Sequence, residues 1–303
     1  MKKIKIVFMG SPEFAIPSLL CLIEKINVIG VVTQPDKPAG RGKALKAPPI
    51  KEIALNHGIE YIQPNRLSDP GVFEKLQSWA PDVIVVVAFG QILRQEVLDL
   101  PPYGCVNVHG SLLPRWRGAA PIQAAILHGD KETGITIMKL DAGVDTGPIL
   151  KQKSITIKED DTSESLGKSL SHLGADLLIE TLNDYVAGNL KPISQPEDGV
   201  TYAARLEKEN GFLDFSKSAL ELDRQVRAYF PWPGTFIEIG NERIKVISTK
   251  VVENIDLKPD ERGQVSGFPI IGTSRGGLML ELVQPAGKKV MSGKIFLNGF
   301  RNW

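Results

Sequence analysis

The chain has 303 residues, of which 42% are hydrophobic and 23% charged, as in a globular protein of one large or two ordinary domains. A formal net charge of +1 excludes a strong whole-molecule attraction for nucleic acid, so any basic surface must be local. Two cysteines, no CxxC pair and no apolar run near the ~20 residues of a membrane helix exclude a disulfide framework and an integral membrane protein. We therefore expect a cytoplasmic protein with reduced cysteines.

The first half of the chain alternates predicted strands with predicted helices. The strands are expected at 3–9, 28–33, 59–62, 82–88 and 105–109, and the helices at 14–25, 48–57, 72–79 and 91–98. This alternation predicts an α/β fold with a doubly wound, mostly parallel, Rossmann-like sheet. The first turn, Gly10 to Phe14, lacks the three glycines of a dinucleotide fingerprint, so we expect no NAD or FAD there.

A basic segment, Thr33 to Pro49, interrupts this alternation. It is rich in proline, glycine and alanine, so it fits neither a helix nor a strand. After Asp36 it has no acid and four cations, Lys37, Arg41, Lys43 and Lys46. Such a segment suits a phosphate backbone, but a solvated basic loop explains it equally well. We expect residues 34–49 to be disordered without a partner, because nothing apolar anchors them.

The stretch from Cys105 to Gln123 is the first candidate for a functional site. At strand spacing, Val106 and Val108 point to one face of the sheet, and Asn107 and His109 point to the other. Ligands of open α/β sheets bind beyond the carboxyl ends of strands, where this pair lies. A lone strand histidine also has a purely structural explanation, in which it only satisfies a neighbouring polar group.

A second candidate stretch, LDAGVDTGPIL from Leu140 to Leu150, follows a strand expected at 135–140. It places Asp141 and Asp145 in a glycine-rich loop, and loops held by a rigid scaffold often bear functional residues. One aspartate could orient His109 while the other caps the loop. No histidine or acid has the spacing of metal ligands, so we expect no metal.

The pattern changes in the second half of the chain. A strand at 152–157 and a long helix at 163–185 precede a linker-like stretch at 188–196. A helix at 220–228 and five short strands at 235–239, 243–252, 263–266, 270–273 and 278–283 then predict a small OB-like β-barrel. We predict a catalytic domain at 1–189, a linker at 190–206 and a C-terminal domain at 207–303.

Several motifs together resemble a known family. They are FMGSPEFA near the start, PDKPAGRGK from Pro35, NVHGSLLPRWRGAAP from Asn107, DAGVDTGP from Asp141, FPWPG from Phe230 and the closing QPAGKKVMSGKIFLNG. With these motifs the chain resembles the formyltransferases that use 10-formyltetrahydrofolate, over nearly its whole length.

The resemblance implies transfer of the formyl group of 10-formyltetrahydrofolate to the α-amino group of methionine on initiator tRNA. It implies a catalytic set without metal or dinucleotide: Asn107, His109 and Asp145. It implies a folate site lined by Ser111, Leu112, Leu113 and Pro114. It also implies that the tRNA acceptor stem meets Lys37, Arg41, Lys43 and Lys46, and that the C-terminal domain holds more of the tRNA. We expect a monomer.

The chemistry is consistent with these side chains. Formyl transfer passes through a tetrahedral oxyanion, to which Asn107 could donate a hydrogen bond. His109 could accept the amine proton or, when protonated, stabilise the oxyanion, and the sequence leaves both open. Asp145 could fix the tautomer of the imidazole or stabilise its charge.

Two other functions compete with this one. The first is a folate-dependent formyltransferase acting on a small nucleotide or an amino-sugar nucleotide. The second is a nucleic-acid-binding protein with an inactive α/β domain. The basic segment and the C-terminal domain favour a large anionic acceptor over the first, and the intact candidate catalytic set argues against the second.

Overall fold

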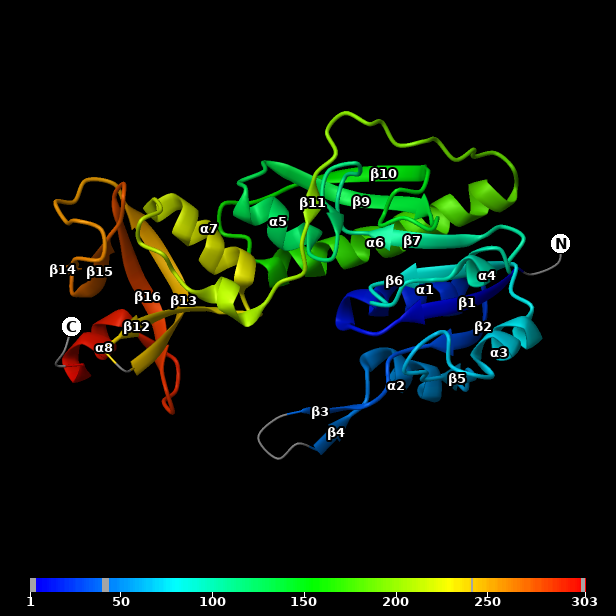
Figure 1. Ribbon diagram of the computed structural model, residues 1–303, viewed down its shortest axis with the longest axis horizontal. Helices are drawn as coiled ribbons and strands as arrows, with labels where there is room; N and C mark the ends of the chain where they lie inside the picture. Colours follow the sequence, from blue (N-terminus) through cyan, green and yellow to red (C-terminus); the bar gives the residue numbers. More distant parts are fainter. Residues whose placement is uncertain (1–3, 40–43, 241, 301–302) are drawn as a thin grey trace. The chain divides into compact units, whose positions relative to one another are not determined.

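The computed structural model describes residues 4–39, 44–240, 242–300 and 303, and the chain divides into two compact units (Figure 1). Unit 1 comprises Met1–Pro121, Thr133–Ile155 and Gly167–Ala203, and unit 2 comprises Ile122–Glu132, Thr156–Leu166 and Ala204–Trp303. Residues 190–203, which we predicted as part of a linker, therefore pack with unit 1. The domain boundaries given above remain predictions.

The sheet of unit 1 has seven described strands in the order β10-β9-β7-β6-β1-β2-β5. The strands from β7 to β5 run parallel, and β9 is antiparallel to β7. This arrangement confirms the predicted doubly wound, mostly parallel sheet. The bounds are β1 (Lys5–Gly10), β2 (Asn27–Val32), β5 (Tyr61–Ile62), β6 (Val83–Val87), β7 (Cys105–His109), β9 (Glu132–Lys139) and β10 (Ile149–Thr156).

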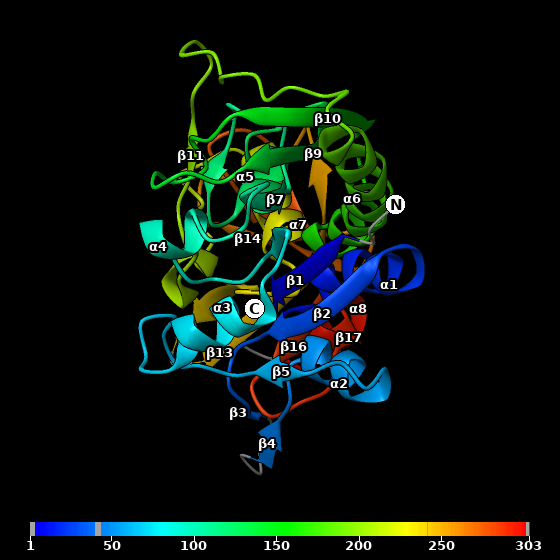
Figure 2. The same ribbon diagram turned by 90° about the vertical axis from the view of Figure 1, so that its right-hand side faces the viewer.

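Helices cover both faces of this sheet. Figure 2 shows α1 (Ile16–Lys25) and α6 (Ser163–Val186) on one side, and α3 (Val72–Trp79) and α4 (Gln95–Leu98) on the other. Helix α2 (Pro49–Asn56) also belongs to unit 1, whereas all of α5 (Pro121–Leu127) except its first residue belongs to unit 2. The helix predicted at 91–98 begins only at Gln95, because Arg94 has an extended backbone (ψ 160°).

The face of β7 that bears the candidate residues is set by strand alternation. Val108 packs toward α6, where a Cβ added to Gly174 would lie 2.8 Å from its Cγ1. Cys105 belongs to the buried cluster that includes Trp79 of α3 and Val97 of α4. Because alternate side chains share a face, Asn107 and His109 lie on the side of Cys105.

The basic segment is not irregular, so that prediction is wrong. Strand β3 (Lys37–Ala39) pairs antiparallel with β4 (Ala44–Lys46), and we call the two strands the basic hairpin. Its base is anchored by polar groups: the carboxylate of Asp36 accepts hydrogen bonds from Lys51 Nζ and Gln63 Nε2, each at 2.7 Å. Apolar patterning does not reveal an anchor of this kind. Arg41 and Lys43 lie outside the described residues.

Unit 2 contains an antiparallel sheet in the order β12-β13-β16-β15-β14, with β17 paired to β16. This confirms a C-terminal domain of antiparallel strands. Leu222 and Val226 of α7 pack in its core with Phe296 of α8. Strand β17 and helix α8 were not predicted, since lysines and glycines obscure their pattern. The bounds are α7 (Ala219–Tyr229), β12 (Thr235–Ile239), β13 (Glu242–Val252), β14 (Arg262–Val265), β15 (Phe268–Gly272), β16 (Gly277–Pro285), β17 (Met291–Ser292) and α8 (Gly293–Gly299).

None of the helices within the described ranges combines the length and apolar character needed to cross a membrane.

Candidate active site

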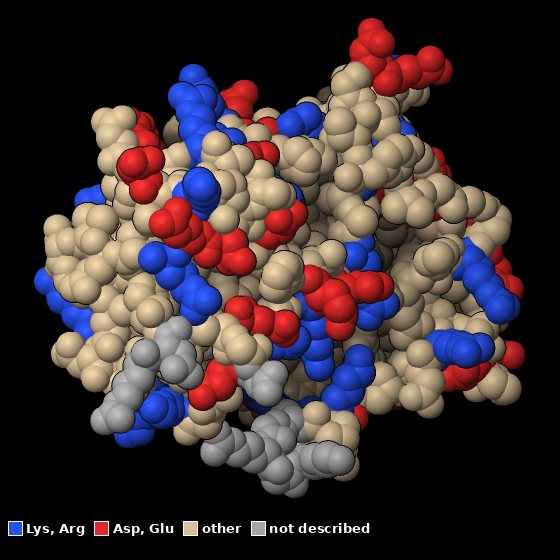
Figure 3. All heavy atoms as spheres, turned by 60° about the vertical axis from the view of Figure 1, so that its left-hand side comes forward, with Lys and Arg blue, Asp and Glu red and all other residues tan. Residues whose placement is uncertain are grey.

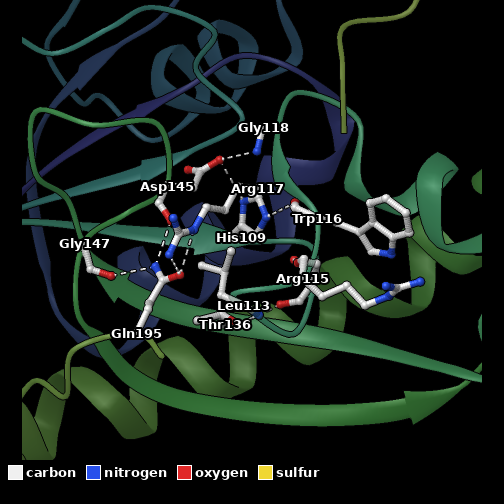
Figure 4. A network of polar contacts seen from close by, with 11 residues as sticks. His109, Leu113, Arg115, Trp116, Arg117, Gly118, Thr136, Asp145, Gly147 and Gln195 are labelled. Atoms are coloured by element: carbon white, nitrogen blue, oxygen red, sulfur yellow. Dashed lines mark hydrogen bonds and ion pairs between the residues drawn. The ribbon is translucent and has the colours of Figure 1, made fainter. Parts of the chain in front are cut away.

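His109 ends β7 with a side chain that is only 5% exposed. Its Nε2 atom lies 2.9 Å from the carbonyl oxygen of Trp116, and its Nδ1 atom lies 3.6 Å from Oδ2 of Asp145 (Figure 4). A carbonyl oxygen can only accept, so we assign a proton to Nε2 on the basis of this partner. The nitrogen that faces the carboxylate is therefore Nδ1.

Asn107 lies two residues earlier on the same face of β7, opposite Met138 of β9. Its side chain is 9% exposed. Within the described ranges its amide makes no hydrogen bond to another protein group. Buried amides are normally hydrogen-bonded, so an amide without a protein partner is available to a ligand.

Asp145 reaches this face from the loop between β9 and β10. Its Oδ2 atom accepts a hydrogen bond of 2.8 Å from the backbone N–H of Gly118. Asp141 is exposed instead, and its Oδ1 accepts from the Gly143 N–H at 3.1 Å and the Thr146 hydroxyl at 2.7 Å. The structure thus brings Asp145 to His109 and leaves Asp141 to cap its own loop.

The turn from Ser111 to Pro114 is held in shape by hydrogen bonds. The Ser111 hydroxyl, fully buried, donates to the carbonyl of Arg115 at 2.6 Å. Thr136 Oγ1 donates to the Ser111 carbonyl at 2.6 Å and accepts from the Leu113 N–H at 3.0 Å. Ser111 and Leu113 thus face inward, and the exposed surface of the turn belongs to Leu112 and Pro114. Of the four predicted folate-site residues, Leu112 and Pro114 can therefore contact a ligand through their side chains.

Arg117 and Gln195 were not among the predicted site residues. Arg117 donates to Gln195 Oε1 from Nε at 3.0 Å and from Nη2 at 2.8 Å. Gln195 Nε2 donates to the carbonyls of Asp145 and Gly147, each at 2.8 Å (Figure 4). Gln195 lies in the proline-containing stretch that we interpreted as a linker, where no periodicity or motif indicated a role.

Two strands from distant parts of the chain support this network. Strand β8 (Arg117–Gly118) pairs in parallel with β11 (Tyr202–Ala203), so residues 195–203 run beside the segment that follows His109. The Trp116 N–H donates to Thr201 Oγ1 at 2.9 Å in the same region. The predicted linker therefore contributes to the architecture of the candidate site.

The cations of the basic hairpin lie apart from this network. Lys37 and Lys46 are exposed and stand opposite each other in the β3–β4 register. Lys37 Nζ donates to Gln34 Oε1 at 2.6 Å, and Gln34 Nε2 donates to the carbonyl of Phe89 at 3.1 Å. Hydrogen bonds thus connect the hairpin to the loop that follows β6.

The buried thiol of Cys105 shares a face of β7 with the candidate residues but has different chemistry. Burial raises the pKa of this thiol to about 12. It stays protonated at neutral pH, which excludes it as a nucleophile. The described residues contain no group of three or more His, Cys, Asp or Glu side chains arranged to hold a metal ion.

Comparison with known proteins identifies the family. The profile described as formyl transferase matches residues 4–182, and a second, for the formyl transferase C-terminal domain, matches residues 205–301. The chain belongs to the formyl transferase family. The family inferred from the sequence motifs is thereby confirmed. Asn107, His109 and Asp145 of this formyltransferase lie in the first matched region, and Gln195 lies between the two.

Relatives of similar length share this family. A protein named methionyl-tRNA formyltransferase from Myxococcus xanthus is 47% identical over 301 residues, which cover 99% of this chain and 96% of that protein. A protein of the same name from Thermodesulfovibrio yellowstonii is 45% identical, covering 97% of this chain and 95% of that protein.

A solved structure shares the fold of the formyltransferase. It is WlaRD, a sugar 3N-formyl transferase crystallised in the presence of dTDP and 5-N-formyl-THF. It superimposes with a TM-score of 0.69 at 20% identity and covers 95% of this chain and all of that chain. At this identity the likeness concerns the fold alone.

Proposed function

We propose that this formyltransferase transfers the formyl group of 10-formyltetrahydrofolate to the α-amino group of methionine on initiator tRNA. The observation that supports this acceptor is the extent of the likeness to relatives named methionyl-tRNA formyltransferase. Eight such relatives are 42–47% identical over 97–99% of the chain, through unit 2 as well as unit 1. By contrast WlaRD, a sugar formyl transferase, shares the fold over 95% of the chain but is only 20% identical.

Asn107, His109 and Asp145 are the proposed catalytic residues. The neutral amine attacks the formyl carbon, and the carbonyl oxygen becomes an oxyanion that the unpartnered amide of Asn107 stabilises by donating a hydrogen bond. The Nε2–H of His109 is committed to a carbonyl, so Nδ1 takes the proton that the amine loses. Asp145 stabilises the resulting imidazolium. The bond from the formyl carbon to N10 then breaks, N10 receives a proton, and no net proton is gained or lost.

The folate is proposed to lie against the turn formed by Ser111, Leu112, Leu113 and Pro114. A hydrogen-bonded turn of fixed shape is a suitable wall for a ligand that must be placed within a fraction of an ångström. The proposed reaction needs no metal, because the amide, the imidazole and the carboxylate supply its polar groups.

The basic hairpin is proposed to contact the acceptor stem through Lys37 and Lys46, together with Arg41 and Lys43. Like charges opposite each other on a two-stranded ladder are unfavourable, and an anion bound beside them removes the repulsion. Tetrahydrofolate derivatives and phosphates are both anionic, but only a nucleic acid presents phosphates in series. Figure 3 shows Lys and Arg side chains (blue) interspersed with Asp and Glu side chains (red) among the residues that the structure describes.

A formylation assay tests the proposal. The purified protein and 10-formyltetrahydrofolate are incubated with methionine charged on initiator tRNA, with free methionine, or with an amino-sugar nucleotide. We expect transfer to the charged tRNA alone. Transfer only to the amino-sugar nucleotide would instead support the small-nucleotide alternative. His109→Ala is the control: it should abolish turnover and leave the affinity for tRNA within a few-fold.

The same proposal includes a monomer that acts in the cytoplasm, with folding units at 1–189 and 207–303 joined by residues 190–206. Translation initiation takes place in that compartment, which supports the location. Light scattering of the purified protein measures the mass, and a mass near the 33.1 kDa of one chain is expected.

A further inference from the structure

Gln195 connects the loop that presents Asp145 to the strand that receives it. Its amide has two N–H groups and two lone-pair directions, and all four are used (Figure 4). The two N–H groups hold the carbonyls of Asp145 and Gly147, and the oxygen takes two N–H groups of Arg117. Strand β8 therefore holds Asp145 twice, through Gln195 and through the Gly118 N–H.

Asp145 needs this support because of its backbone. Its φ of 51° lies in the left-handed region, which is uncommon for residues other than glycine, and the contacts around Asp145 help to hold it there. The loop around it contains Gly143 and Gly147, whose missing side chains let Thr146 and the carbonyl of Lys139 approach closely. If the loop relaxed, the carboxylate would leave its place 3.6 Å from His109.

The network also depends on the side chain being an amide. Arg117 is 9% exposed, and its guanidinium needs an acceptor that can take two N–H groups at once. The carbonyls of Asp145 and Gly147 need a donor. A glutamate in place of Gln195 would accept from Arg117, but its second oxygen would face the two carbonyls and could not donate to them. A methionine would provide neither the acceptor for Arg117 nor the donor for the carbonyls.

We infer that Gln195 is a positioning residue of the active site, which together with Arg117 holds the Asp145 carboxylate opposite His109. The inference rests on the proposed function for its kinetic consequence. It assigns a part in formyl transfer to a residue that lies between the two regions matched by the family profiles.

The test is a double-mutant cycle on the full chain with Gln195→Met, Asp145→Asn and the two combined. Misplacing a catalytic group by about 1 Å costs on the order of 10²-fold in rate, so Gln195→Met should lower kcat by this order. The KM values for folate and for charged tRNA should stay within a few-fold. Since Gln195 acts through Asp145, the substitution should cost less than about 3-fold once Asp145→Asn is present.

Gln225 offers a matched control within unit 2. It is buried, whereas Gln195 is half-buried, and its Nε2 donates to two backbone carbonyls, those of Asn210 and Phe212, at 2.8 and 2.9 Å. Gln225→Met removes two donor bonds of the kind that Gln195 makes to Asp145 and Gly147. Gln195→Met also removes the acceptor of Arg117, so Gln225→Met should lower the melting temperature by no more than Gln195→Met does. It should leave kcat within a few-fold, and its effect should add fully to that of Asp145→Asn. A kcat for Gln195→Met no lower than that for Gln225→Met, or an effect on KM alone, would overturn the inference.

A measurement without turnover separates this inference from the proposed function. The ring ¹⁵N resonances of His109 at one fixed pH should move in the same direction in Gln195→Met as in Asp145→Asn, and should not move in Gln225→Met. If the wild-type protein transfers no formyl group, the proposed function fails, and these resonances still decide whether Gln195 places Asp145. Unchanged resonances in Gln195→Met would refute the placement.

Discussion

The Nδ1 atom of His109 lies 3.6 Å from Oδ2 of Asp145, while its Nε2–H is held by the carbonyl of Trp116. The carboxylate therefore faces the one ring nitrogen that remains to exchange a proton. Asp145→Asn removes this charge at nearly constant volume. We expect kcat to fall by about 10²- to 10⁴-fold, the range of a lost acid–base function, with KM little changed. Initial rates of formylation measure the effect.

Asp141→Asn is the control for this prediction. Asp141 lies four residues earlier in the same loop, is exposed and bonds only within the loop. Its substitution should leave kcat within a few-fold. Equal losses in the two variants would show that the loop, and not the Asp145 carboxylate, is what the reaction requires.

Asn107→Ala tests the oxyanion role of the unpartnered amide. Loss of one oxyanion donor typically costs about 10²- to 10³-fold in kcat, and we expect a loss in this range. Because no described protein group bonds the amide, the truncation should leave the thermal unfolding midpoint almost unchanged. Calorimetry alongside the rate assay gives both values. A variant that unfolds at much lower temperature but retains its kcat would assign Asn107 to structure.

The fold could be predicted well because its signals are local. The continuous β-branched run of β6 predicts a strand buried on both faces, and all of its residues are buried. The alternation in β7 predicts only which residues share a face, since Asn107 and His109 are buried as well. Strands β3 and β4 gave no such signal. The hydrogen bonds that hold their base join Asp36 to Lys51 and Gln63, which lie 15 and 27 residues later in the sequence. Hydrogen bonds between distant side chains leave no period in a sequence.

The candidate site was predictable only in part, for the same reason. Asn107 and His109 come from one strand, so their common face follows from a period of two. The choice of Asp145 over Asp141 required the family motif, because both lie in the same loop and their spacing from His109 does not favour either one. Gln195 is 86 residues from His109 in sequence, and only the pairing of β8 with β11 brings its segment to the site.

Deletion of residues 40–43 tests the basic hairpin. The deletion removes Arg41 and Lys43 and should cripple formylation of tRNA, mainly through KM, while folate binding stays intact. For the single variant Lys46→Ala, the slope of log affinity for tRNA against log salt should decrease by about 1. Lys25→Ala, a change of equal charge at an exposed position of α1, is the control and should leave that slope unchanged. Undiminished formylation by the deletion variant would refute the role of the hairpin.

Asp36 should make stability depend on acid pH. The hydrogen bond from Gln63 and then the ammonium of Lys51 hold the pKa of the Asp36 carboxyl below its ordinary value of 3.8. The folded state thus favours the charged form, and this contribution is present above the ordinary value. It is lost as the pH falls through the lowered pKa of the folded state.

The measurement is the difference in unfolding free energy between the wild type and Asp36→Asn, from pH 6 to pH 2. We expect this difference to be constant down to about pH 4 and then to shrink. When both proteins also carry Gln63→Met, this difference in unfolding free energy should be smaller at every pH. The hydrogen bond from Gln63, which is the largest cause of the lowered pKa of Asp36, is then absent. A difference independent of pH would contradict the role of Asp36 as the anchor of the hairpin.

Cys105 should make the unfolding free energy decrease as the pH rises, whereas Asp36 makes it decrease as the pH falls. Its thiol has an ordinary pKa of 9.0, and burial raises the pKa to about 12 in the folded state. Between these values the unfolded chain ionises and the folded chain does not, so the unfolding free energy should fall as the pH rises above 9. The slope should approach about 1.4 kcal/mol per pH unit relative to Cys105→Ala, which lacks the thiol.

At pH 8 a thiol reagent should label Cys21, which is partly exposed, and reach Cys105 only after denaturation. Parallel stability curves for the two proteins, or rapid labelling of both thiols in the native state, would show that the face of β7 bearing Asn107 and His109 is open to water at Cys105.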